Sequence, residues 1–147
     1  MTATLILWRH ARTAYNRERR LQGSLDIPLG DHGSAQARAA AQRLVDEHGA
    51  PDRVLSSPLS RARASADELA AVCSLEVEVD DAFTQRPYGV WEGLTWDEVR
   101  ERWPKEYERR RRGLDPEIDG WGRSVDIARR VGDGLRRVAA EGTTVAV

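Results

Sequence analysis

Short apolar runs alternate with longer amphipathic segments along the chain. We predict strands over the short runs, at residues 4–8, 54–56, 77–79 and 143–147. We predict helices over the longer segments, at residues 34–48, 57–71, 95–112 with a kink or restart at Pro104, and 124–140. This alternation predicts an α/β fold, a three-layer α/β/α sandwich with a mostly parallel central sheet. No repeat, low-complexity tract or linker divides the chain, so we expect a single domain over residues 1–147.

Local signals mark where several of these elements begin. Ser57 followed by Pro58 is typical of a helix start, with serine at the N-cap and proline at the first helical position. Thr95 and Glu98 have the spacing of a capping box, which predicts that a helix begins there. The polar segment 16–29, which contains glycine and proline, is predicted to be an irregular connection.

Composition excludes several classes of protein. The 147 residues are 40% hydrophobic and 32% charged, which is typical of a globular domain rather than a disordered chain. With 23 Lys and Arg against 24 Asp and Glu, the formal net charge of −1 provides no general attraction to nucleic acid or membranes. No apolar run has the length of a membrane span or a signal peptide core, and Cys73 is the single cysteine. We therefore expect a cytoplasmic protein with neither a nucleic-acid nor a membrane partner, and the oligomeric state stays open.

A cation and an imidazole, Arg9 and His10, follow directly on the first predicted strand. Ligands of open α/β folds bind outside the carboxyl ends of the strands, so the pair predicts a catalytic anion site. A zinc site would need several clustered ligands, but the only other histidines, His32 and His48, lie in a loop and at a helix end. A Ser-His-Asp hydrolase would need a serine on a sharp turn flanked by glycines, and the sequence contains no such motif.

Covalent catalysis by histidine on phosphorus remains, and it needs guanidinium groups to hold the phosphoryl oxygens. Arg9 offers one such group. Arg61, in the first turn of the helix after the second strand, offers another. Both residues follow a strand, so we expect them to meet at one edge of the sheet.

Several separated motifs also occur in a recognisable order. They are the run 9–13 with Asn16, the runs 21–23 and 26–29, Gly33 with 36–37, and the runs 56–62 and 88–93. With these motifs the chain resembles the histidine phosphatase superfamily, in its phosphoglycerate mutase-like branch. The resemblance covers nearly the whole chain and implies the fold of a phosphoglycerate mutase.

The resemblance also implies a mechanism and a set of site residues. His10 would attack phosphorus to form a phosphohistidine while Arg9 and Arg61 clamp the phosphoryl group. Water would then release phosphate, without a metal or other cofactor. The residues implied to bind substrate at the mouth of the site are Thr13, Asn16, Gln22 and Gly23. The expected partner is a small-molecule phosphate ester, which the sequence does not identify.

Three positions depart from the family pattern. Ala11 stands where a glycine usually follows the motif histidine. Gln85 stands where a glutamate protonates the leaving oxygen, and loss of this general acid costs about 10²–10⁴-fold in rate. A second catalytic histidine normally ends the strand that residues 143–147 begin, so we expect the domain to be incomplete at its C-terminus.

These departures leave more than one function open. The first is a phosphatase that hydrolyses a phosphate monoester through a phosphohistidine on His10 and is impaired by Gln85 and by the missing second histidine. The second is a non-catalytic pseudo-phosphatase that binds phosphate, and the third is a phosphotransferase of the phosphoglycerate mutase type. Glu92 could replace the missing acid, but a carboxylate in such a turn more often accepts local backbone hydrogen bonds.

Overall fold

The computed structural model describes residues 3–147, and the first two residues of the expected domain lie outside this range. Its sheet contains the strands β1 (Thr4–Ile6), β2 (Arg53–Ser56), β3 (Val77–Val79) and β4 (Thr144–Ala146). The strands are parallel and stand in the order β1-β4-β2-β3, so the last strand in the sequence lies between the first two. The predicted parallel α/β sheet is confirmed.

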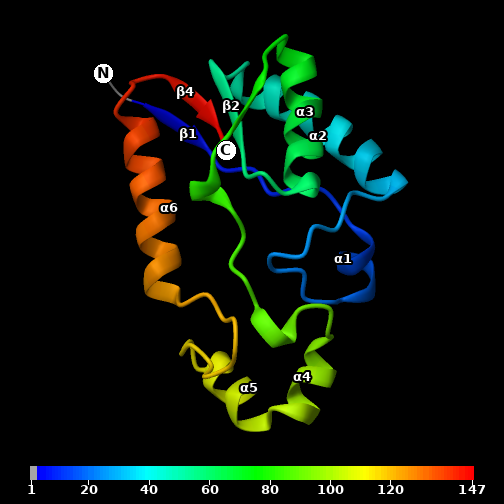
Figure 1. Cartoon of the computed structure of the whole chain (residues 1–147). Coiled ribbons are helices and arrows are strands. Elements are labelled where there is room, and N and C mark those ends of the chain that lie inside the picture. The colour runs from blue at the N-terminus through cyan, green and yellow to red at the C-terminus, as the bar shows by residue number, and fades with distance from the viewer. Residues whose placement is uncertain (1–2) are drawn as a thin grey trace.

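Helices cover both faces of this sheet (Figure 1). The helices α2 (Asp31–His48) and α3 (Ser60–Cys73) pack against one face, where Val54 and Ala146 are buried with them. The helix α6 (Ser124–Ala139) packs against the other face, where Leu55 and Val145 are buried beside Val138. Successive strand residues therefore point into different apolar layers, as the three-layer arrangement requires.

A second group of helices lies beyond one end of the sheet (Figure 1). We call it the α4–α5 lobe, residues 86–123; it contains η2 (Gly89–Trp91), α4 (Trp96–Arg102) and α5 (Pro104–Arg111). Trp91 is fully buried there and meets Trp121 edge to face, with ring centroids 5.5 Å apart. This aromatic packing stabilises the lobe without a sheet of its own.

Several predicted starts of helices are confirmed and two are wrong, since α2 begins at Asp31 rather than at residue 34 and α3 also begins elsewhere. Thr95 and Glu98 form the expected capping box at α4, and α5 begins at Pro104. The helix α3 begins at Ser60 rather than at Ser57-Pro58. The physical reason is a distant cap, since the carboxylate of Asp26 accepts hydrogen bonds from the backbone N–H and the hydroxyl of Ser60, both at 2.7 Å.

The connection after β1 is more regular than predicted. A short helix, α1 (Ala14–Glu18), starts the segment that we expected to be irregular. Thr13 and Asn16 form a capping box at its N-terminus, and Arg19 ends it in the left-handed conformation with φ of 58°. Asparagine in place of the usual glutamate or glutamine hid this signal in the sequence.

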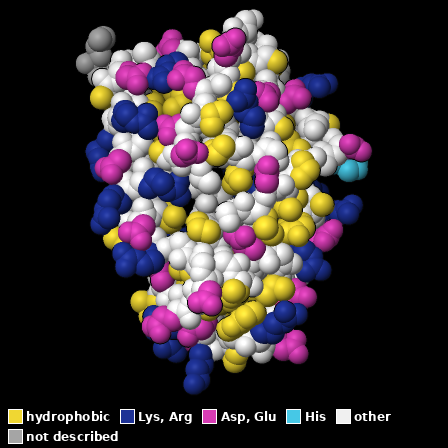
Figure 2. All heavy atoms as spheres, viewed as in Figure 1, with side chains coloured by type: hydrophobic (Ala, Val, Ile, Leu, Met, Phe, Trp, Pro, Cys, Tyr) yellow, Lys and Arg dark blue, Asp and Glu magenta, His cyan; other side chains and the backbone are white. Residues whose placement is uncertain are grey.

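On the face of the molecule shown in Figure 2, acidic and basic side chains are interspersed, and neither sign of charge dominates. Most of the ion pairs are exposed i,i+3 or i,i+4 pairs along helices, such as Arg63 with Asp67. In the described part of the chain, no helix combines the length and the apolar character needed to cross a membrane.

Candidate active site

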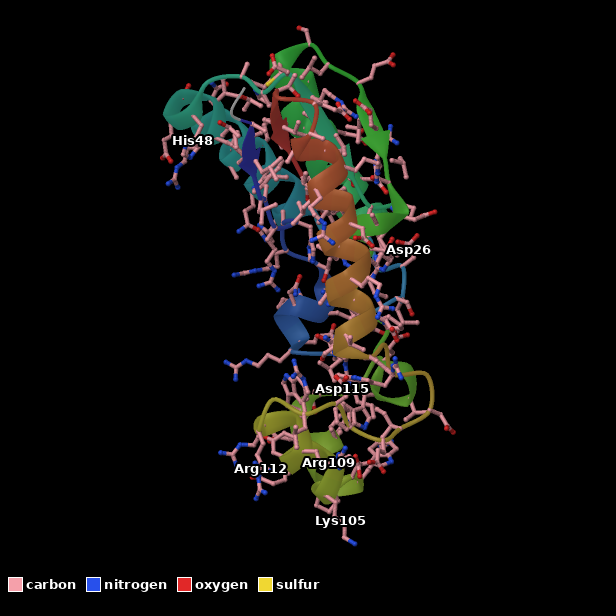
Figure 3. All side chains as sticks on the ribbon, turned by 90° about the vertical axis from the view of Figure 1, so that its left-hand side faces the viewer. Asp26, His48, Lys105, Arg109, Arg112 and Asp115 are labelled. Atoms are coloured by element: carbon pink, nitrogen blue, oxygen red, sulfur yellow. The ribbon has the colours of Figure 1, made fainter. Side chains whose placement is uncertain are left out.

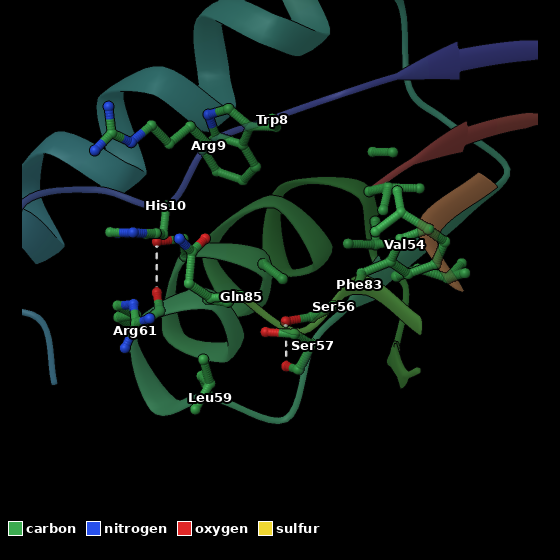
Figure 4. Close-up of a pocket in the computed structure, with 17 residues that line it drawn as sticks. Trp8, Arg9, His10, Val54, Ser56, Ser57, Leu59, Arg61, Phe83 and Gln85 are labelled. Atoms are coloured by element: carbon green, nitrogen blue, oxygen red, sulfur yellow. Dashed lines mark hydrogen bonds between the residues drawn. The ribbon is translucent and has the colours of Figure 1, made fainter. Parts of the chain in front are cut away.

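A cavity of about 260 Å³ opens at the carboxyl ends of β1, β2 and β4 (Figure 4). Arg9 and His10 reach it from the end of β1, and Arg61 reaches it from the first turn of α3. Gln85 reaches it from the segment after the short helix η1 (Asp81–Phe83). The structure therefore brings together the four side chains that we expected to carry the chemistry.

The imidazole of His10 is held in one tautomer. Its Nδ1 lies 2.7 Å from the carbonyl oxygen of Ala11, which can only accept, so Nδ1 carries the proton and donates it. Nε2 is then left with its lone pair. In Figure 4 the His10 side chain lies between those of Arg9 and Arg61.

The surroundings of His10 favour the neutral imidazole. Burial lowers the pKa of His10 from its usual value, the carbonyl of Ala11 opposes this shift, and the charges of Arg61 and Arg9 add to it. A neutral imidazole with a free lone pair is the form that attacks phosphorus. These surroundings therefore favour a neutral His10 whose Nε2 lone pair is free.

Arg61 is buried, and both terminal nitrogens of its guanidinium bind backbone carbonyls. Its side chain is 2% exposed, and its guanidinium donates to the carbonyl oxygens of Leu25 and Gly23, both at 2.7 Å. Burial lowers the pKa of Arg61, but a guanidinium keeps its proton in proteins. These bonds use only part of its five N–H donors, so the others are available to a ligand in the cavity.

A serine connects Arg61 to the segment that carries His10. The hydroxyl of Ser65 donates to the carbonyl of Arg61 at 2.8 Å and accepts the backbone N–H of Ala11 at 3.0 Å. Ala11, the first departure from the family pattern, is buried and takes part in this link. The segment that carries His10 and the helical turn that carries Arg61 are thereby fixed relative to one another.

Glu92 holds the loop that in turn holds Arg61. Its Oε1 accepts the backbone N–H of Ser24 at 2.7 Å, the hydroxyl of Ser24 at 2.8 Å and the backbone N–H of Tyr88 at 3.0 Å. Gly23 next to it has a φ of 55°, and a Cβ there would lie 2.9 Å from the backbone nitrogen of Tyr88. Glu92 thus accepts one local backbone hydrogen bond, from Tyr88, as predicted for such a carboxylate, and also binds Ser24, which is 68 residues away in sequence.

The predicted residues of the substrate mouth bind one another. The hydroxyl of Thr13 donates to Oε1 of Gln22 at 2.7 Å, and Oδ1 of Asn16 accepts the backbone N–H of Thr13 at 3.0 Å. None of the three lines the cavity, and Thr13 is only 2% exposed. They shape the loop beside the site, and their contact with substrate stays a prediction.

Gln85 is supported by an arginine that sequence reasoning missed. Arg130 of α6 donates to the carbonyl oxygens of the turn before Gln85, those of Asp81, Ala82 and Thr84, each at 2.8 Å. Gly134, one turn along α6, lets this helix approach closely, because a Cβ there would lie 2.8 Å from that of Ala82. The backbone that presents Gln85 is therefore fixed against α6.

Asp115 fixes the other side of Gln85. It accepts the backbone N–H of Ser124 at 2.7 Å, the hydroxyl of Ser124 at 2.6 Å, Nε1 of Trp121 at 3.0 Å and the guanidinium of Arg86 at 3.2 Å. Desolvation acts to raise the pKa of Asp115. The hydrogen bonds, those from Ser124 above all, outweigh it and hold this pKa well below its usual range. Asp115 lies where α6 meets the α4–α5 lobe (Figure 3).

The residues of the cavity do not form a metal centre. Within residues 3–147, no group of three or more His, Cys, Asp or Glu side chains is placed to hold a metal ion. The polar lining consists of cations, hydroxyls and one amide, which together suit a phosphoryl group.

The fold and the site together define a class of proteins. This class transfers phosphoryl groups, and it combines a parallel α/β/α fold with one histidine between two arginines at the carboxyl edge of the sheet. The family model of the histidine phosphatase superfamily (branch 1) matches residues 5–147, and the chain belongs to this superfamily.

Named relatives agree with this assignment. The chain is 40% identical over 105 residues to phosphoserine phosphatase 1 of Hydrogenobacter thermophilus, a match that covers 71% of this chain and 49% of that protein. It is 32% identical to a 2,3-bisphosphoglycerate-dependent phosphoglycerate mutase of Chelativorans sp., over 95% of this chain and 65% of the mutase.

A solved structure agrees as well. The mycobacterial glucosyl-3-phosphoglycerate phosphatase superposes with a TM-score of 0.84 at 30% identity, covering 97% of this chain and 72% of that one. The chain spans about half the length of the first curated relatives, 49% and 54%.

Proposed function

We propose that this chain is a phosphatase that takes the phosphoryl group of a small phosphate monoester onto His10 and releases it to water. The observation that carries this proposal is the neutral imidazole of His10, with Nε2 free, between the guanidinium groups of Arg9 and Arg61 in one cavity.

Each residue has a defined part in this reaction. Nε2 of His10 attacks phosphorus while the carbonyl of Ala11 stabilises the positive imidazolium that forms. Arg9 and Arg61 neutralise the charge on the phosphoryl oxygens, and the buried position of Arg61 strengthens this interaction. A water molecule then attacks the phosphohistidine and releases inorganic phosphate.

The names of the relatives support a small phosphorylated molecule as substrate. Phosphoserine and glucosyl-3-phosphoglycerate, named for two of them, are both phosphate monoesters of small metabolites. We propose the same general class for this chain.

One observation favours a second candidate function. The amide of Gln85, in place of a carboxyl group, cannot protonate a leaving oxygen, so a chain with this site could bind phosphate without turnover. This non-catalytic phosphate-binding function uses the same clamp of Arg9 and Arg61, and only a chemical test separates it from the phosphatase.

Rapid-quench labelling with a radioactive phosphate ester provides that test. We expect acid-labile label on the chain within one turnover and none on His10→Ala, because only His10 offers an activated nucleophile in the cavity. His32→Ala, an exposed histidine at the start of α2, is the matched control and should label as the parent does. Binding of the ester without label on the parent chain would establish the non-catalytic function instead.

A further inference from the structure

Among the described residues, no side chain that lines the cavity is a carboxylic acid or another proton donor suited to a leaving oxygen at neutral pH. Of the residues that line it within the described range, the titratable ones are Arg9, His10 and Arg61. The two guanidinium groups keep their protons, because an arginine side chain is not deprotonated in a folded protein. His10 is the nucleophile and uses its Nδ1 proton on the carbonyl of Ala11.

Three carboxylates on the segments around the cavity have partners elsewhere. Asp26 accepts two hydrogen bonds from Ser60, and these lower its pKa. Asp80 pairs with Arg137 at 2.6 Å, which lowers its pKa as well. Glu92 accepts three hydrogen bonds from Ser24 and Tyr88. All three act as acceptors in ion pairs or loop contacts, and none lines the cavity.

Gln85 lines the same cavity as His10, at the position where the family resemblance implies a proton-donating glutamate. Its side chain is exposed to the cavity and has no hydrogen-bond partner among the described residues. An amide donates a hydrogen bond to an oxygen but does not give up its proton, so it can orient a leaving group without neutralising it.

We propose that this site takes phosphoryl groups from compounds with an acidic leaving group, namely aryl and enol phosphates and acyl phosphates, in preference to alkyl phosphates. This inference rests on the proposed function and specifies its substrate class. It follows from the amide at position 85, because a leaving group that departs as a stable anion needs no proton from the protein.

The first step forms one bond to phosphorus and breaks another. The lone pair on Nε2 of His10 forms the N–P bond, and the P–O bond breaks with its electron pair on the leaving oxygen. The leaving group departs as an oxyanion that accepts a hydrogen bond from Gln85 and takes its proton later from water. In the second step the oxygen of water bonds to phosphorus, the N–P bond breaks, His10 returns to its neutral form and one proton enters solution.

A series of leaving groups tests this inference with the chain as it stands. The probes are phenyl, 4-nitrophenyl and 2,4-dinitrophenyl phosphate, which share charge and ring but differ in the acidity of the phenol, together with acetyl phosphate. Phenol itself resembles the tyrosine side chain, with a pKa of about 10. We expect the His10-dependent rate to rise steeply from phenyl to dinitrophenyl phosphate.

A single substitution should remove this dependence. Gln85→Glu restores a proton donor, and we expect a gain of about 10²–10⁴-fold on phenyl phosphate but little gain on 2,4-dinitrophenyl phosphate. The matched control is Gln36→Glu, which makes the same chemical change on the exposed face of α2 and can still accept the backbone N–H of Arg12. This control should keep the steep dependence of the parent chain.

The possible outcomes separate this inference from the proposed function. A His10-dependent rate that is equal for all leaving groups in the parent chain would overturn the inference and leave the phosphatase intact. Equal gains on all probes in Gln85→Glu would also overturn it. The absence of any His10-dependent turnover or label, with every probe, would overturn the proposed function and the inference with it.

Discussion

Individual residues at the site act through charge and burial together. His10 is neutral because it is partly buried near the positive charges of Arg61 and Arg9. Of these two arginines, Arg61 is the buried one. The same arginine holds the loop 22–26 through the carbonyls of Gly23 and Leu25. One side chain thus links the electrostatics of the nucleophile to the shape of the loop beside it.

The charge of Arg61 should be measurable at His10. In Arg61→Met, which removes the charge and keeps the length, we expect the pKa of His10 to rise from its lowered value toward 6.5, while burial and Arg9 still act to lower it. In the proposed mechanism the neutral imidazole is the nucleophile, so labelling is lost as pH falls through this pKa and the acid limb should move to higher pH. An NMR titration of the imidazole, assigned with His10→Ala, gives the value directly.

A neighbouring arginine controls for this measurement. Arg63 lies on the same helix and pairs with Asp67 at 2.9 Å on the surface, so Arg63→Met should leave the pKa of His10 unchanged. An unchanged pKa in both variants would contradict the role that we assign to Arg61.

At the scale of elements, helix α6 supports the segment that presents Gln85. Arg130 satisfies three carbonyl groups of the turn 81–84, and Gly134 allows the helix to approach this turn. The backbone that presents Gln85 is therefore held by a helix residue 46 to 49 positions away in sequence.

Loss of this support should lower stability. We expect Arg130→Ala to reduce the free energy of unfolding by about 1–3 kcal/mol, because it leaves three carbonyl groups without their charged donor. Arg129→Ala removes an exposed arginine whose ion pair with Asp126 is long, 3.8 Å, and should cost less than about 0.5 kcal/mol. Chemical denaturation measures the free energy of unfolding of both variants. Equal losses of stability in the two would contradict the role of Arg130 in holding the turn 81–84.

At the scale of the whole molecule, the sheet and the α4–α5 lobe are joined near the site. Asp115 connects the start of α6 to Trp121 and Arg86 in the lobe, and Glu92 connects the lobe to the loop 22–26. The cavity with His10 lies between these links. Its geometry therefore depends on how the two parts pack together.

The pH dependence of stability should report the link through Asp115. Its pKa is lower in the folded chain than in the unfolded one, where it is about 3.9. The stabilisation is therefore fully present above that value and is lost as pH falls below it. We expect Asp115→Asn to lower the free energy of unfolding at pH 7 by about 1–3 kcal/mol and to flatten its fall between pH 5 and acid.

An exposed aspartate in the same lobe serves as the comparison. Asp119 has no side-chain hydrogen bond or ion pair among the described contacts, so Asp119→Asn should leave both the stability and its pH dependence close to those of the parent. If the two variants unfold alike at every pH, Asp115 does not join the two parts.

Much of the fold could be predicted from local patterns. The apolar runs, the amphipathic helices and the capping box at Thr95 and Glu98 act within a few residues, and all of them are found in the structure. The convergence of Arg9, His10 and Arg61 also followed from one rule, that parallel strands present their carboxyl ends at the same edge.

The wrong and missing predictions share a different cause. The start of α3 depends on Asp26, 34 residues before it in sequence, and the hold on Arg61 depends on carbonyls 36 and 38 residues away. Backbone carbonyls carry no residue identity, so no sequence motif marks them as partners.

The order of residues alone thus determined most of the elements and the meeting of Arg9, His10 and Arg61 in one cavity, because these depend on short-range periodicity and on residue type. Only the packed structure decided that β4 inserts between β1 and β2, that Glu92 holds a loop across 68 residues, and that Gln85 lines the cavity beside His10. The reason is physical: such contacts form when distant segments bury their apolar faces together, and they exist only once that burial is complete.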